Sequence, residues 1–179
     1  AFGTVGAICR WYEQSTLATG SDLWVMPMSS RVRVPFLDSP AFKGDGASSP
    51  DGRWVAYVSD ESGREEVYVR TYPAKSGRLQ VSVAGGEWPL WSHDGKRLYF
   101  SQGRRLMAVD FRGGGPEAGA DRPQEVLAGF DFGRGALDVL PDGTGFVLVQ
   151  PTSRGLVEIR LVAGWTRELL DTVPVATRR

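Results

Sequence analysis

The sequence predicts an all-β protein made of β-propeller blades, each blade a four-stranded antiparallel meander. The first observation is a recurring turn: "SPDG" at 49–52 returns as "SHDG" at 92–95 and "LPDG" at 140–143, at steps of 43 and 48 residues. An apolar run follows each copy. The second observation is composition, because the 179 residues include 23 glycines, 11 prolines and 6 tryptophans, which is typical of a turn-rich β-protein.

Each repeated turn is a hairpin signal. Asp bonds to its own backbone and Gly adopts a positive φ, so the apolar runs on either side are expected to pair. The run "WVAYVS" at 54–59 is apolar on both faces, with Trp54, Ala56 and Val58 on one face and Val55 and Tyr57 on the other. A strand that is apolar on both faces must be covered on both. We therefore expect the sheets to stack side by side.

The repeat period divides the chain into blades. Strands that follow the hairpins recur at 22–28, 66–72, 105–111 and 156–162. We expect a single propeller segment over 20–174, with a partial blade at 20–44 and blades at 45–84, 85–132 and 133–163. The tail, 164–179, includes a possible helical turn at 164–171, and 1–19 has no assignment. This makes about 3.5–4 blades.

So few blades form an open arc or a partial propeller, because four-bladed rings are uncommon. An open arc exposes the apolar face of each terminal sheet. At roughly 25 cal/mol per Å², a few hundred Å² of bare face corresponds to several kcal/mol. Terminal repeats need a polar cap, and the sequence shows none. We therefore expect a homo-oligomer or a place in a larger propeller.

Charge and composition exclude several classes of protein. Lys plus Arg (21) equals Asp plus Glu (21), so no global field attracts nucleic acid. The basic patches at 30–35 and 104–105 are too short for nucleic-acid recognition. No apolar run approaches the roughly 20 residues of a membrane span, and the first residues lack the charged region of a signal peptide. Cys9 is the single cysteine, which excludes an internal disulfide and a cysteine-rich zinc site.

The candidate binding residues are Glu87 and Trp88. They lie in "GGEWP" at 85–89, where a connection enters a new innermost strand. Such connections line one mouth of a propeller channel, so we expect a protein, peptide or small ligand to contact this pair. The acidic segment "SDESGREE" at 59–66 is interpreted as an exposed hairpin loop. No motif indicates a cofactor or a metal site.

The alternative is a hydrolase of the esterase or peptidase type, with the only histidine, His93, as its base. Ser92 and Asp94 flank His93, but neighbours in a tight turn point in different directions, so a remote serine such as Ser49 would have to be the nucleophile. No G-x-S-x-G elbow is present. We favour a surface-turn histidine and a non-catalytic protein. A lyase and a purely structural oligomerisation arc also stay open.

The stretch "SPDGRWVAYVSDESGREEVYVR" resembles the TolB-like, WD-related propeller repeat of bacteria. The order of "DLWVMPM", "GGEWPLWSHDGKRLYF" and "RLMAVD" is similar to the C-terminal propeller of bacterial serine/threonine protein kinases. His93 stands where that repeat usually has proline. The resemblance implies a sensor or protein-interaction domain on the extracytoplasmic side of a membrane. It implies no kinase activity, because "DFG" at 131–133 is the only kinase-like triplet.

Overall fold

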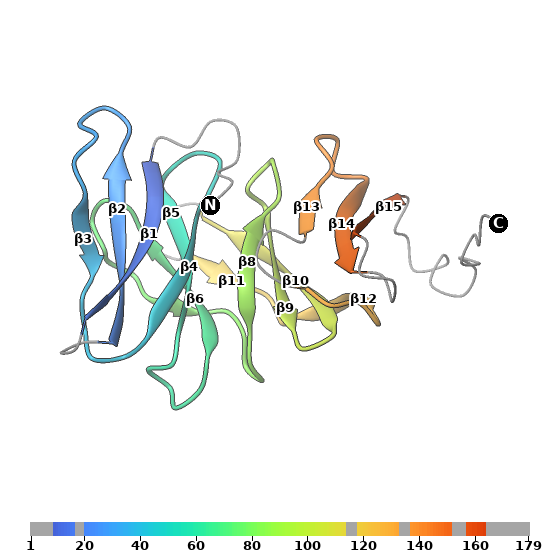
Figure 1. The fold of residues 1–179 in the computed structure, drawn as a ribbon, viewed down its shortest axis with the longest axis horizontal. Helices are drawn as coiled ribbons and strands as arrows, with labels where there is room; N and C mark the ends of the chain where they lie inside the picture. The colour runs from blue at the N-terminus through green and yellow to red at the C-terminus, as the bar shows by residue number, and fades with distance from the viewer. Residues whose placement is uncertain (1–8, 17–19, 114–117, 133–136, 152–156, 164–179) are drawn as a thin grey trace.

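A computed structural model describes residues 9–16, 20–113, 118–132, 137–151 and 157–163. All regular structure in these residues is antiparallel β-strand, arranged in four sheets that follow one another in chain order (Figure 1). The described part contains no helix that is long and apolar enough to cross a membrane. The predicted all-β class is confirmed.

The strands fall into four groups. The first sheet holds β1 (Cys9–Thr16), β2 (Gly20–Pro27) and β3 (Val34–Leu37), and the second holds β4 (Lys43–Ser48), β5 (Trp54–Ser59), β6 (Glu66–Thr71) and β7 (Leu79–Gln80). The third holds β8 (Glu87–Trp91), β9 (Arg97–Gln102) and β10 (Arg105–Arg112), and β10 also pairs with β11 (Gly119–Ala120) and β12 (Gln124–Ala128). The fourth holds β13 (Leu137–Val139), β14 (Gly145–Pro151) and β15 (Val157–Ala163).

Apolar side chains fill the space between each pair of neighbouring sheets. Every residue of β5 is buried. Trp54, Ala56 and Val58 pack with the third sheet, while Val55 and Tyr57 pack with the first. A further cluster, which includes Tyr99 and Phe146, joins the third and fourth sheets. The two-faced burial expected of "WVAYVS" is confirmed, and the sheets stack as propeller blades do.

The first strand, β1, comes from a segment that the sequence left without assignment. It pairs with β2 along its whole length, and its Trp11 packs edge-on against Phe36 at 5.0 Å between ring centroids. Asp22 of β2 aligns with Glu66 of β6 when the repeats are superposed. β1, β2 and β3 therefore correspond to β5, β6 and β7, the second to fourth strands of the second sheet. The helical turn predicted at 164–171 lies outside the described residues.

The two edges of the arc, at the top and at the bottom of Figure 1, carry different loops. Figure 1 shows the Asp-Gly turns at its top, where each innermost strand turns back into the next strand. The hairpin loop at 60–65 and the connections that lead into β4 and β8 lie at its bottom. We call these the turn end and the connection end. Among the described residues, the first sheet lacks the innermost strand of a blade and the fourth sheet lacks the outermost strand. The arc is open there.

Candidate ligand-binding site at the connection end

The innermost strands β4 and β8 carry the same bulge. In β8, Glu87 pairs with Ser101 and Leu90 with Tyr99, so two residues oppose one. The pairing of β4 with β5 shifts in the same way between Gly44 and Ala47. The first bulged residue is left-handed in both strands, with φ of 53° at Asp45 and 54° at Trp88. Such a backbone costs an L-residue about 1–2 kcal/mol, and bulges re-aim a side chain.

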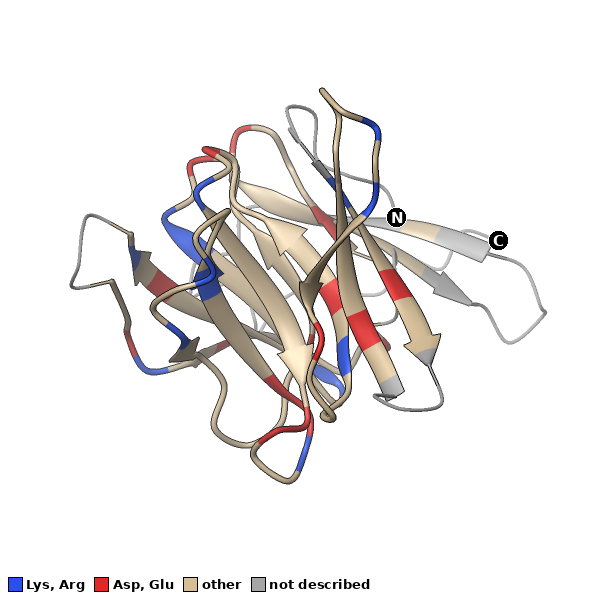
Figure 2. Cartoon of the chain, turned by 90° about the vertical axis from the view of Figure 1, so that its left-hand side faces the viewer, with Lys and Arg blue, Asp and Glu red and all other residues tan. Residues whose placement is uncertain are grey.

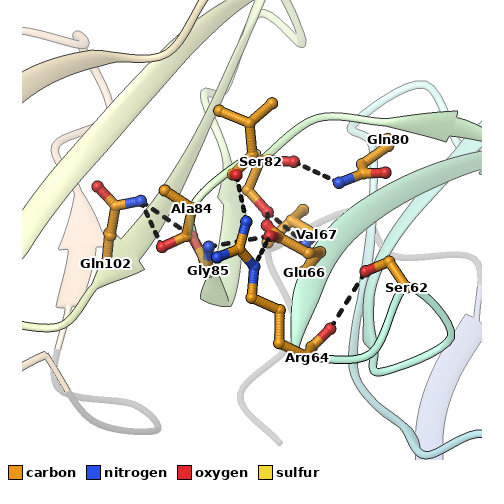
Figure 3. Close-up of polar contacts among 10 residues, drawn as sticks. Ser62, Arg64, Glu66, Val67, Gln80, Ser82, Ala84, Gly85 and Gln102 are labelled. Atoms are coloured by element: carbon orange, nitrogen blue, oxygen red, sulfur yellow. Dashed lines mark hydrogen bonds and ion pairs between the residues drawn. The ribbon is translucent and has the colours of Figure 1, made fainter.

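A buried carboxylate ties the connection before β8 to the second sheet (Figure 3). Glu66, the first residue of β6, is fully buried. Its Oε1 accepts from Arg64 Nε at 2.6 Å and from the Gly85 amide at 3.0 Å. Its Oε2 accepts from the Ser82 hydroxyl, which itself accepts from the Val67 amide at 2.7 Å. The interpretation of 59–66 as an exposed loop is therefore wrong for Glu66, because these donors replace water.

The same connection is held from the third sheet as well. Gln102 of β9 donates from Nε2 to the carbonyls of Ala84 and Gly85, at 3.0 and 3.2 Å (Figure 3). On the other side, Arg64 Nη2 donates to the Val83 carbonyl at 2.5 Å. Two sheets thus fix the backbone that leads directly into Glu87 and Trp88. These two residues sit on a rigid support, which lowers the entropy lost on binding a ligand.

The carboxylates of Asp60, Glu65 and Glu87 lie close enough at this end to interact electrostatically, whereas Figure 2 shows acidic and basic residues mixed over the described strands and loops. Glu87 is exposed, and Glu65 belongs to the hairpin loop of the neighbouring sheet. Burial, followed by the negative charges of Glu87 and Asp60, raises the pKa of Glu65 above its ordinary value. A cation placed here would relieve that repulsion. The half-buried Trp88 adds an aromatic ring, which attracts ammonium and guanidinium groups. Among the described residues, no group of three or more His, Cys, Asp or Glu side chains could hold a metal ion.

The residues of the hydrolase alternative lie at the turn end, away from Glu87 and Trp88 (Figure 1). Ser92 Oγ donates to Asp94 Oδ1 at 2.7 Å and accepts from the Arg97 amide at 2.9 Å. Exposed His93 has its Nε2 3.0 Å from the Val139 carbonyl of the fourth sheet. The structure thus brings Ser92 and Asp94 together within one turn, and places His93 against another sheet.

Ser49 has the same environment as Ser92 in the preceding repeat. Its Oγ donates to Asp51 Oδ1 at 2.6 Å and accepts from the Trp54 amide at 3.0 Å. Burial tends to raise the pKa of Asp51, but hydrogen bonds from Ser49 and Arg53 outweigh it, so that pKa is lowered. The hydrogen bond from Ser92 is the main cause that lowers the pKa of Asp94. In both turns the serine hydroxyl and the carboxylate hold the hairpin closed.

Comparison with known proteins places this fold. No family model matches the chain. Over 80 residues, 44% of the chain, it is 29% identical to the uncharacterized peptidase YuxL of Bacillus subtilis, of which the match covers 12%. TolB from Acinetobacter baumannii aligns with a TM-score of 0.54 at 16% identity, over 89% of this chain and 51% of TolB. Oligogalacturonate lyase from Vibrio parahaemolyticus aligns with a TM-score of 0.56 at 13% identity, over 87% and 46%.

These neighbours show that the chain has the TolB-like β-propeller fold. The chain spans about half the length of the solved structures that it matches. The residues that the structure describes form a partial propeller of four sheets.

Proposed function

We propose that the chain is a non-catalytic β-propeller module that binds a protein, peptide or small ligand at its connection end, with Glu87 and Trp88 as contacts. One observation supports this most. The segment that presents both residues is clamped by Glu66 and Gln102 from two sheets, while its rim pairs the carboxylates of Glu65 and Glu87. That combination of rigidity, negative charge and an aromatic ring favours a ligand with a cationic group.

A matched peptide series tests the proposal. Peptides with one lysine or arginine are titrated against the protein by calorimetry, with the same peptides carrying acetyl-lysine or citrulline as neutral counterparts. Cationic peptides are expected to bind, and Glu87→Gln and Trp88→Ala are each expected to weaken them about tenfold. Glu125→Gln, an exposed carboxylate on β12, is the control. Equal affinity for charged and neutral peptides, or no effect of either variant, would refute the proposal.

The hydrolase is retained as a second candidate because the 80-residue match carries the name of a peptidase. A panel of ester and peptide substrates decides between the two. The binding module shows no turnover, and His93→Ala leaves its ligand affinity unchanged. Turnover by the wild type that His93→Ala abolishes would instead establish the hydrolase with His93 as base.

We further propose that the module belongs to a larger bacterial protein in which a kinase domain precedes it, on the basis of the sequence resemblance. Its place would then be the extracytoplasmic side of the membrane. The coding sequence upstream of residue 1 tests this directly, since it is expected to encode a kinase domain and then a membrane span.

Apolar side chains on both flanks of the arc support a further proposal, that another β-propeller surface packs against each flank. Tyr12 and Trp24 are half-buried on the face of the first sheet opposite Trp11, Leu23 and Val25, which pack on the second sheet, and Ile159 on β15 is 72% exposed. We propose that a second copy, or further blades of the same parent protein, covers these flanks. The mass of the native particle distinguishes an assembly from a monomer.

A further inference from the structure

A cleft at the turn end, opposite the connection end, has the chemistry of a second ligand site. It has a volume of about 260 Å³ and lies between the Asp-Gly turns of the second and third sheets. Trp54 and Phe111 line it, with ring centroids 5.3 Å apart in an edge-on contact. Arg53 and Lys96, the residues after the two turn glycines, line it as well.

Two carboxylates, Asp51 and Asp94, line the cleft, and both already accept hydrogen bonds from their own turns. Asp51 Oδ1 accepts from Ser49 Oγ and from the Arg53 amide, at 2.6 and 3.0 Å. Asp51 Oδ2 accepts from Arg53 Nε at 2.7 Å. This bond uses only Nε, so the two terminal amino groups of Arg53 keep their donor capacity. The equivalent Asp94 Oδ1 accepts from Ser92 and from the Lys96 amide in the same pattern.

Three donors at the cleft have capacity to spare. Within the part of the chain that the structure describes, neither the Lys96 ammonium nor the terminal groups of Arg53 forms a further hydrogen bond or salt bridge. The indole N–H of Trp54 has no acceptor among those residues either. Gly113 leaves room beside this nitrogen, because a Cβ there would lie 2.7 Å from Trp54 Nε1 and 3.0 Å from a ring carbon of Phe111.

We propose that this cleft binds a small organic carboxylate with one planar apolar ring. The anionic group is held by Arg53 and Lys96, with the Trp54 N–H as an additional donor, and the ring lies against Phe111. The spare N–H donors of Arg53, Lys96 and Trp54 outnumber the acceptor sites that remain on Asp51 and Asp94, which favours an anion over a neutral group. The aromatic lining and the small volume favour a ligand with a single ring over a larger ligand. This site is independent of the proposed function at the connection end.

Benzoate is the probe, and benzamide, which has the same shape without the charge, is its neutral control. Indole ¹H–¹⁵N correlation spectra follow the Trp54 resonance, which is assigned by its loss in Trp54→Phe. Benzoate is expected to shift that resonance saturably, with a Kd on the order of 1 mM, and benzamide is not. The double variant Arg53→Gln, Lys96→Gln is expected to bind benzoate about tenfold more weakly. Arg122→Gln, an exposed cation elsewhere, should bind it normally.

The remaining outcomes overturn the proposal. They are a shift that never saturates, equal responses to benzoate and benzamide, or undiminished benzoate binding by the double variant. Gly113→Ala is an independent steric test. Its methyl group crowds Trp54 Nε1, so it should weaken benzoate binding without removing a charge. The dispersion of each variant's spectrum shows that the variant is folded, so a loss of binding can be assigned to the cleft.

Discussion

At the scale of single residues, neighbouring side chains of the Asp-Gly turns differ in burial and in hydrogen bonding. The hydroxyl of Ser92 is buried and bonds within its turn, whereas His93 beside it is exposed. Removal of a buried hydroxyl leaves its partners without a donor or an acceptor. The contribution of the turn to stability is therefore concentrated in the serine.

We predict that Ser92→Ala lowers the free energy of unfolding by about 1–3 kcal/mol, because the Arg97 amide and Asp94 each lose a partner. His93→Ala is the matched neighbour and should cost less than about 1 kcal/mol, since it removes one exposed contact. Urea denaturation of both variants measures the difference. A larger loss for His93→Ala would mean that the contact with Val139 is the main anchor of the turn.

Glu65→Gln is predicted to stabilise the protein at neutral pH. Burial and the charges of Glu87 and Asp60 raise the pKa of Glu65 in the folded state above its ordinary value of 4.5. The folded state therefore holds the proton more tightly, and charging Glu65 as pH rises through this window destabilises the fold. Glutamine removes that penalty. Melting temperatures should be higher for the variant at pH 7 and equal to wild type below pH 4.5; an equal gain at both values would exclude a charge effect.

At the scale of strands and connections, the repeated bulge and the buried Glu66 are the features that shape the connection end. Asp45 and Trp88 occupy the same place in successive innermost strands, with the same left-handed φ. Asparagine, aspartate and glycine tolerate that conformation better than a β-branched residue does.

Position 45 therefore allows a test of the bulge without loss of an aromatic ring. Asp45→Gly is expected to change the free energy of unfolding by less than about 0.5 kcal/mol, and Asp45→Val to lower it by about 1–3 kcal/mol. Chemical denaturation of the pair gives both numbers. If valine were tolerated as well as glycine, the strand would have to be able to lose its bulge.

Glu66→Ala is predicted to lower the free energy of unfolding by about 3–5 kcal/mol, because Arg64, Ser82 and Gly85 lose a buried acceptor together. Glu66→Gln, which keeps one acceptor oxygen, should cost less. Hydrogen exchange of the Gly85 amide provides a local readout and should accelerate most in the alanine variant. Unchanged protection of that amide would show that Gln102 alone holds the connection.

Much of this fold follows from the sequence, because hairpin turns and two-faced strands leave clear patterns. Asp51 and Asp94 mark their turns, and Trp54 to Val58 mark a strand covered on both sides. β1 was missed because no Asp-Gly turn precedes it to mark its place in the repeat. The burial of Glu66 was missed because two of its three donors, Ser82 and Gly85, lie far along the chain. The cleft depends on the spacing of two blades, which no local pattern encodes.

At the scale of the whole molecule, the described sheets form an arc with different flanks. Tyr12 and Trp24 are half-buried on the first sheet, and Ile159 is exposed on the last. Each interior gap is closed by a core cluster of large side chains. A flank without a neighbour lacks that contribution, which is roughly 25 cal/mol for each Å² of apolar surface.

We predict that the isolated chain forms an assembly at micromolar concentration, seen by native mass spectrometry and light scattering as a multiple of the monomer mass. Ile159→Asp should shift the population toward monomer, because it places a charge on an apolar flank. Glu125→Gln should leave it unchanged. A wild-type chain that stays monomeric would show that the flanks are stable in water or are covered by the chain itself.

The shared bulge of β4 and β8 has a consequence for how such a module acquires new partners. The same bulge presents the carboxylate of Asp45 in one blade and the indole of Trp88 in the next. If the connection end binds a ligand as proposed, a single substitution at this bulge position changes the side chain that meets the ligand, provided that the new residue tolerates the left-handed φ. Asp45 and Trp88 are two such side chains at the equivalent position of adjacent blades.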